Sequence, residues 1–264
     1  MGASSLGRTT EATARRRPRG RAEGAVSVTR LLDAARHWDA GKVAAAVQQR
    51  PALASATDRN GRTALHVCAG ATAERTRRPP SAAVATARAL LAAGAHIDAV
   101  HDIRDRTESF PARALWHAIA RGRNRTLARF LLRQGANADY CLWSVVWDDD
   151  LATARLLLAH GANLDLTFHG ETSLLYATRL RRTRMMRWLL RNGADVNLAD
   201  VEGRTPLFHA VRRRFPLAQV EELLRHGADP ARAAADGASP LSLVAGARAQ
   251  DLARLLRKYV PAAR

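Results

Sequence analysis

Two stretches of this sequence have the composition of a metal or catalytic site. Two histidines and two aspartates fall within residues 96–102, and three consecutive aspartates stand at 148–150. Metal ligands must converge on one centre, which three consecutive residues cannot do. We interpret 96–102 as extended chain, in which the side chains of these residues do not converge on one centre. We expect the aspartates to stabilise the N-terminus of a helix at 151–160 through its dipole, with Asp149 or Asp150 as the cap.

The known catalytic sequence motifs are absent from the chain. It contains no Gly-rich phosphate loop, no HExxH and no GxSxG, and its nine histidines are dispersed. The two cysteines, Cys68 and Cys141, show no metal-binding spacing, so we interpret them as core residues of a protein in a reducing compartment. We expect no enzymatic activity, no bound metal and no cofactor.

A Gly-Ala pair recurs after Leu-rich segments. The five glycines are Gly94, Gly135, Gly161, Gly193 and Gly227. They are 41, 26, 32 and 34 residues apart. A glycine with positive φ commonly ends a helix by satisfying its last carbonyls.

A second repeated pattern begins with a hydroxyl residue that can cap a helix. It reads Thr-Ala-Leu-His at 63–66 and Thr-Pro-Leu-Phe-His at 205–209, with degraded copies at 172–177 and 239–245. Pro206 stands at the first helical position, where the missing N–H costs nothing. The five Gly-Ala pairs and four opening motifs together indicate a tandem repeat of about 33 residues.

These motifs resemble those of the ankyrin-repeat family over residues 28–260. The resemblance implies an all-α solenoid of stacked helix-turn-helix units with short β-hairpin-like fingers. It also implies that His66 hydrogen-bonds to nearby backbone and that the protein binds partners, without naming one. The expected units are 28–57, 58–101, 102–139, 140–166, 167–199, 200–233 and 234–264.

The segment 1–27 is predicted to be a disordered Arg-rich tail. Residues 1–30 hold seven arginines and two glutamates, a net charge of +5, and few apolar residues. The tail lacks the apolar segment of a secretory signal, and Leu6 breaks a myristoylation motif. The tail could tether nucleic acid, direct the chain to an organelle, act as an uncleaved export signal, or have no role.

The whole chain is strongly basic, with 42 Lys+Arg against 24 Asp+Glu and a net charge of +18. Only Lys42 and Lys258 are lysines. Many arginines beside abundant alanine are typical of a high-GC genome and suggest a bacterial source, so the charge alone argues weakly for nucleic acid. No apolar run reaches the ~18 residues of a membrane span.

Four features depart from a regular repeat. We expect Trp38 to cover the open end of the stack, and residues 73–80, with their Pro-Pro pair, to form a solvent loop. The finger at 102–113 is over-long, and the next finger, at 139–142, is almost missing. We expect this difference to leave a notch in the groove wall, surrounded by aromatic residues that could bind a partner.

By resemblance, the finger tips and the ends of the inner helices face a concave groove. Arg121, Arg179 and Arg212 should then form a basic row, suited to a protein, a phosphorylated peptide or nucleic acid. The predicted partner-binding residues are Trp116, His117, Arg121, Tyr140, Trp143, Phe168, His169, Tyr176, Arg179, Glu202, Arg204, His209 and Arg212.

We therefore predict a non-enzymatic scaffold, monomeric and cytoplasmic, that binds a protein through its concave groove. One alternative is a protein that associates with nucleic acid through its tail and basic groove. A second is a secreted bacterial effector or regulator that acts on a host protein in the host cell.

Overall fold

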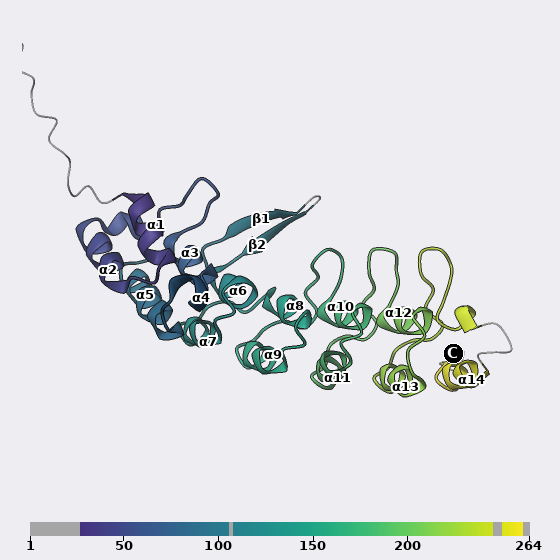
Figure 1. Cartoon of the computed structure of the whole chain (residues 1–264). Helices are drawn as coiled ribbons and strands as arrows, with labels where there is room; N and C mark the ends of the chain where they lie inside the picture. Colours follow the sequence, from purple (N-terminus) through teal and green to yellow (C-terminus); the bar gives the residue numbers. More distant parts are fainter. Residues whose placement is uncertain (1–26, 106–107, 245–249, 261–264) are drawn as a thin grey trace, which may run out of the picture.

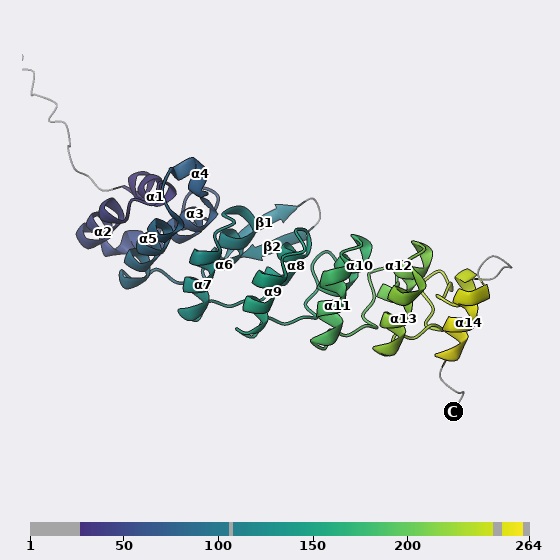
Figure 2. The same ribbon diagram turned by 60° about the horizontal axis from the view of Figure 1, so that its bottom comes forward.

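The computed structural model describes residues 27–105, 108–244 and 250–260. The predicted tail therefore lies outside the described residues, apart from Ser27. The helices stack side by side in two layers, inner and outer, along an extended chain (Figures 1 and 2). Among the described residues, inner and outer helices alternate in sequence, so each unit contributes one helix pair.

The inner layer runs from the first helix to a short turn near the C-terminal end. Its elements are α1 (Val28–Arg36), α3 (Ala64–Gly70), α6 (Ala114–Trp116) continuing as the π-helix η2 (His117–Arg121), α8 (Cys141–Val146), α10 (Ser173–Arg179), α12 (Pro206–Arg212) and the 3-10 turn η3 (Ser242–Val244). The outer helices are α2 (Ala40–Gln49), α5 (Pro80–Ala92), α7 (Arg125–Arg133), α9 (Leu151–Leu158), α11 (Thr183–Arg191), α13 (Leu217–Arg225) and α14 (Gln250–Lys258).

The Gly-Ala pairs end outer helices, as their sequence indicates. Gly193 has a φ of 89°. Its N–H donates to the carbonyl of Leu190, and the N–H of Ala194 donates to that of Leu189, both at 3.1 Å. This is the Schellman arrangement, which satisfies the last carbonyls of a helix. The paired alanine is buried against the next unit.

The hydroxyl residues cap inner helices. The side chains of Thr63, Thr172 and Thr205 each accept a hydrogen bond from the backbone N–H three residues later. All three threonines are buried. Because a cap satisfies a donor that the helix itself leaves unpaired, each inner helix begins at a defined residue.

The over-long finger is a two-stranded antiparallel hairpin. Strand β1 (His101–Asp105) pairs with β2 (Glu108–Ala112), with Ile103 opposite Phe110. In Figure 1 the hairpin leans along the stack over α6 and α8. The next finger is almost absent, as expected, because Tyr140, with a φ of 63°, directly precedes α8.

Two expectations about the N-terminal units are wrong. Trp38 does not cover the open end, because it is 1% exposed and its Nε1 donates to the carbonyl of Cys68 in the next unit (2.9 Å). The segment 73–80 is not a plain loop. Thr72 caps a short helix, α4 (Ala73–Thr76), and Pro80 begins α5. Proline fits the first turn of a helix, so the Pro-Pro pair starts the helix rather than blocking it.

The apolar core lies between the two layers and runs through every described unit. The outer helices contribute leucines such as Leu90, Leu131 and Leu189, which are all fully buried. Trp38 belongs to this core together with the five-residue 3-10 helix η1 (Pro51–Ser55), which buries Leu53. Among the described residues, no helix is long and apolar enough to cross a membrane.

Gly122 gives a test of the packing between units. An added Cβ there would lie 2.2 Å from the carbonyl oxygen of Ala69, in the neighbouring inner helix. We expect Gly122→Ala to lower the free energy of unfolding by about 1–3 kcal/mol, because that backbone oxygen cannot move aside cheaply. Urea denaturation followed by circular dichroism would measure the change.

The matched control is Gly41→Ala, in α2. Its Cβ would meet nothing closer than 3.7 Å, so the substitution should leave stability unchanged or raise it by up to about 1 kcal/mol. Equal stability of the two variants would show that the close approach at Gly122 is absent in solution.

Candidate functional site

An open groove of about 540 Å³ lies on the inner side of the fifth and sixth units. Two fingers and the inner helices α10 and α12 form it. We call it the C-terminal groove. Its lining residues are His169, Glu171, Arg179, Asp200, Val201, Glu202, Arg204, His209, Arg212 and Arg213.

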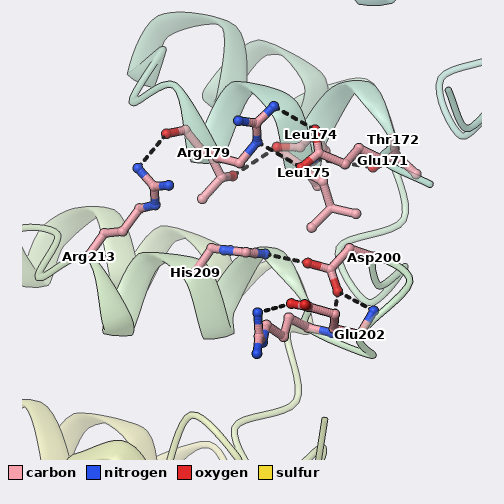
Figure 3. A network of polar contacts seen from close by, with 11 residues as sticks. Glu171, Thr172, Leu174, Leu175, Arg179, Asp200, Glu202, His209 and Arg213 are labelled. Atoms are coloured by element: carbon pink, nitrogen blue, oxygen red, sulfur yellow. Dashed lines mark hydrogen bonds and ion pairs between the residues drawn. The ribbon is translucent and has the colours of Figure 1, made fainter. Parts of the chain in front are cut away.

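The second finger of the groove is built on Asp200. Its Oδ1 accepts hydrogen bonds from the backbone N–H groups of Glu202 (3.0 Å) and Arg204 (2.9 Å), as in an Asx turn. Its Oδ2 lies 2.8 Å from Nε2 of His209, on α12. One carboxylate therefore fixes the shape of the finger and joins it to the inner helix (Figure 3).

The first finger is joined to its own inner helix through Arg179. Nη2 of this arginine donates to Oε2 of Glu171 at 2.9 Å, and its Nε lies 2.7 Å from Oε1, so the two side chains form an ion pair with one hydrogen bond. The guanidinium also lies over the ring of Tyr176, 5.1 Å from its centroid. From the next unit, Arg213 donates through Nη1 to the carbonyl of Arg179 at 3.0 Å. Figure 3 shows Arg179 with Glu171 and Arg213 with the carbonyl of Arg179.

The groove carries charges of both signs. Three carboxylates and four arginines line it. Arg204 pairs with Glu202 at the second finger. Arg212 is exposed and has no ion-pair partner among the described residues. Arg213 likewise has no ion-pair partner among the described residues, and its side chain bonds only to a backbone carbonyl. Val201, at the tip of the finger, is 84% exposed, so the groove offers a partner these two cations and one apolar contact beside its fixed ion pairs.

Six predicted partner-binding residues line this groove: His169, Arg179, Glu202, Arg204, His209 and Arg212. Trp116 and Trp143 line a separate cavity of about 550 Å³ between the third and fourth units. His117 and Arg121 line a third cavity, at the N-terminal end. Phe168, Tyr140 and Tyr176 belong to an aromatic cluster described below.

Sequence reasoning missed the central role of Asp200, although a signal for it exists. The finger reads Asp-Val-Glu-Gly-Arg-Thr, and the finger that starts at Asp58 reads Asp-Arg-Asn-Gly-Arg-Thr. Oδ1 of Asp58 likewise accepts the N–H groups of Asn60 and Arg62, both at 2.9 Å. The shared Asp-x-x-Gly spacing therefore marks the carboxylate that shapes each of these two fingers.

Comparison with known proteins agrees with the observed stack. The family model described as ankyrin repeats (3 copies) matches residues 81–200 and again residues 185–262, more than half of the chain. The chain belongs to the ankyrin repeat family. The family resemblance and the all-α solenoid expected from the sequence are thereby confirmed.

The ankyrin segments of several proteins are similar to parts of this chain. The Neurogenic locus Notch protein of Drosophila melanogaster is 44% identical over 92 residues, which are 34% of this chain and 3% of that protein. A putative ankyrin repeat protein of Acanthamoeba polyphaga mimivirus is 33% identical over 119 residues, 42% of this chain and 15% of that protein. The ankyrin repeat and SOCS box protein 11 of Danio rerio is 38% identical over 96 residues, 35% of this chain and 31% of that protein. This chain thus spans less than a third of each of these relatives.

Solved ankyrin structures resemble most of the chain. The ankyrin repeat domain of Bcl-3, described as a member of the IkappaB family, has a TM-score of 0.67 and 25% identity, covering 86% of this chain and 97% of that one. An ankyrin repeat domain from Acinetobacter baumannii has a TM-score of 0.59 and 28% identity, covering 75% and 98%. The human ASB11 ankyrin repeat domain, at 24% identity and a TM-score of 0.60, covers 89% and 99% and shares the fold.

The long hairpin brings Phe110 against the aromatic residues of the expected notch between the third and fourth ankyrin units. Phe110 of the hairpin is 4% exposed, and its ring centroid lies 5.1 Å from that of Trp116 and 4.8 Å from that of Phe168. Trp143 stacks on Tyr176 at 4.4 Å, with an interplanar angle of 15°. The aromatic cluster comprises Phe110, Trp116, Tyr140, Trp143, Phe168 and Tyr176. The hairpin occupies the place of the missing finger. Phe110 and Tyr176 are buried, the other four rings are half-buried, and Trp116 and Trp143 also line the cavity between these units.

The expected basic row does not form one continuous surface. Arg179 is paired with Glu171, whereas Arg121 and Arg212 line different cavities. Arg121 lies over the ring of Trp116, 5.6 Å from its centroid. The charge at the ends of the inner helices is therefore divided between the two ends of the ankyrin stack.

The acidic segment and the two cysteines have structural contacts. Asp150 caps α9 by accepting the N–H of Thr153 at 3.1 Å, which confirms its expected role. Asp149 accepts the N–H of Met185 in the next unit at 3.0 Å. Cys68 and Cys141 are buried free thiols, and burial raises the pKa of each. Among the residues that the structure describes, no group of His, Cys, Asp and Glu is arranged to hold a metal.

Three histidines meet inside the first three ankyrin units: His66, His101 and His117. Their ring centroids are 5.3–5.9 Å apart, and Nδ1 of His101 lies 3.2 Å from Nε2 of His117. His66 accepts the N–H of Thr63 at Nδ1 and contacts the carbonyl of Ala99 through Nε2 at 2.9 Å. Because Nδ1 accepts the hydrogen bond from Thr63, it carries no proton and the imidazole is neutral. These contacts confirm the structural role expected for His66.

Burial is the main cause of the low pKa values in this histidine cluster. Burial lowers the pKa of His66 to about 4 and that of His117 to about 2, with further lowering of the His117 value by the neighbouring His66 and Arg121. Burial also lowers the pKa of His101, which is 8% exposed. The three rings are therefore uncharged in the folded chain at neutral pH.

The histidine cluster predicts loss of stability in acid. An unfolded histidine has a pKa near 6.5, so below that value the unfolded chain binds more protons than the folded one. These groups leave the free energy of unfolding unchanged above pH 6.5. They lower it as the pH falls from 6.5 towards 4 for His66 and on towards 2 for His117. Urea titrations should show the free energy of unfolding falling by up to about 1.4 kcal/mol per pH unit for each of His66 and His117.

Two variants test whether the buried histidines cause this pH dependence of the free energy of unfolding. His117→Gln removes one titrating ring and should reduce the slope between pH 6.5 and 5, whatever its effect on stability at pH 7. The exposed His160 serves as the control, and His160→Gln should keep the parent slope. A slope that His117→Gln leaves unchanged would contradict the assignment.

Proposed function

We propose that this chain is a non-enzymatic recognition module that binds a protein partner in the C-terminal groove. Ankyrin repeats are protein–protein interaction modules, and this chain carries them. The observation that supports the groove is its fixed geometry, because Asp200 with His209 and Glu171 with Arg179 hold both fingers against the inner helices. A surface that is ordered before binding loses little conformational entropy when a partner arrives.

The charges of the groove favour a protein over nucleic acid. A polyanionic backbone needs a run of unpaired cations, whereas the groove alternates carboxylates with arginines. A folded protein surface offers both signs of charge and apolar side chains at short spacing. Val201 and Arg212 are the groove residues most available for such contacts, because one is 84% exposed and the other has no ion-pair partner among the described residues.

The cellular setting belongs to the same proposal. We infer a monomer that acts in the cytoplasm as a scaffold. The exported bacterial effector depends on residues 1–27, and the nucleic-acid alternative depends on these residues together with the basic groove. Residues 1–27 fall almost entirely outside the described residues. Deletion of residues 1–27 would abolish export or nucleic-acid capture under those alternatives and would leave groove binding intact under ours.

Substitutions in the C-terminal groove should weaken partner binding. We expect Arg212→Glu and Val201→Asp each to reduce retention of the partner at least about fivefold, because each changes an exposed contact and neither holds the fold. The assay is a pull-down from native lysate with the immobilised full chain, with and without nuclease, followed by quantitative mass spectrometry.

Arg184→Glu provides the control for charge, because Arg184 is an exposed arginine on the outer helix α11. It should retain the same protein as the parent chain. Loss of the retained material on nuclease treatment would contradict protein binding. Equal retention by all three variants would place the binding surface elsewhere.

A further inference from the structure

Another cavity lies towards the opposite end of the stack from the C-terminal groove. It is an open cavity of about 520 Å³ on the inner side of the first three units, where α1, α3, α4 and η2 meet. We call it the N-terminal basic pocket. Its lining residues are Arg36, His37, Arg62, His66, Val67, Gly70, Ala71, Thr72, Arg75, His117 and Arg121.

The lining of this pocket is basic throughout. Four arginines and three histidines line it, and no carboxylate does. Two of the arginines are neutralised from outside the lining, Arg36 by Asp33 at 3.4 Å and Arg62 by Asp58 at 2.8 Å. The C-terminal groove, by contrast, contains three carboxylates of its own.

The other two arginines of the pocket are unpaired. Within residues 27–105, 108–244 and 250–260, Arg75 and Arg121 have no acidic partner. Both are exposed, and they come from different units, Arg75 from α4 and Arg121 from the end of η2. Two unpaired guanidinium groups at one cavity create a positive potential that an anion would relieve.

Two buried histidine rings form the floor of the pocket. His66 and His117 are 1% and 2% exposed, and both line the cavity. The charge of Arg62 lowers the pKa of both rings, and that of Arg121 lowers the pKa of His117. Burial is the main cause of both low pKa values, so the two rings stay neutral, and the floor places no carboxylate against an anion.

The shape and chemistry of the pocket define the anion. Arginine presents a planar fork of N–H donors that matches the oxygens of phosphate, and two such groups match a doubly charged phosphate monoester. The lining contains no Phe, Tyr or Trp on which a nucleic-acid base could stack. The cavity is a pocket in one region of the stack, not a basic track along it.

We propose that the N-terminal basic pocket binds a phosphorylated serine or threonine side chain of a partner protein. Arg75 and Arg121 hold the phosphate, and the lining of the pocket contains no carboxylate that would repel it. The site shares no residue with the C-terminal groove, so it stands even where that groove binds nothing. Phosphorylation of the partner would then switch this contact on.

The test is a titration of the full chain with a short phosphoserine peptide of otherwise neutral residues, followed by NMR of the histidine rings. The matched peptide carries unmodified serine. We expect saturable shifts of the His66 and His117 signals with the phosphopeptide alone. Arg75→Gln and Arg121→Gln should each weaken binding about tenfold or more, as expected for the loss of a charge-assisted contact.

Arg184→Gln is the matched control, because Arg184 is an exposed arginine on the outer helix α11 that lines neither cavity. It should bind the phosphopeptide as the parent does. Equal affinity for the serine peptide, or affinity that both pocket variants retain, would overturn the proposal. Tighter binding of a single-stranded RNA oligonucleotide that is lost in Arg75→Gln would also overturn it, in favour of nucleic acid. Failure of the lysate pull-down would leave this result unaffected.

Discussion

Four successive junctions, from the second ankyrin unit to the sixth, carry a hydrogen bond that the sequence repeats. An Asp or Asn side chain near the end of one unit accepts the backbone N–H at the matching place in the following unit. The four bonds run to Asp98 from Asn137, to Asp139 from Asn163, to Asp165 from Asp195 and to Asn197 from Asp229, at 2.9–3.3 Å. This ladder fixes the register in which neighbouring units share their apolar core, because a slipped unit would leave these donors unpaired.

The ladder explains how irregular units fit into the stack. Its longest and shortest links join residues 39 and 24 positions apart in the sequence. The longest spans the long hairpin, and the shortest spans the missing finger. The donors and acceptors still meet, so the difference in length is absorbed by the fingers and not by the helix pairs. Phe110 then completes the adaptation, because the hairpin carries this ring into the space that a regular finger would occupy.

Local signals in the sequence were sufficient for features that depend on one or two residues. Positive φ at Gly193, the cap at Thr205 and the cap at Asp150 follow from side-chain and backbone chemistry within a single turn. The family was equally accessible, since it depends on repeated motifs. The buried position of Trp38 was not, because it depends on a hydrogen bond to Cys68, 30 residues away.

The site was predictable only in part, for the same physical reason. Finger tips and helix ends were identified by resemblance, and six of those residues line one groove. Which arginines are neutralised depends on contacts between segments, such as Arg179 with Glu171 and Arg62 with Asp58. The histidine cluster likewise joins residues from three places in the chain, of which only His66 stands in a recognisable motif.

The net charge of +18 therefore says less about partners than the pairing of individual arginines does. An arginine that is bonded to a carboxylate presents little field beyond that contact, as at Arg179, and serves to hold a finger in place. An arginine without such a partner, as at Arg121 or Arg212, remains available to a ligand. Arginines without an ion-pair partner among the described residues line both cavities, whereas carboxylates belong to the lining of the C-terminal groove alone. The two cavities of the ankyrin stack therefore differ in the chemistry of their linings.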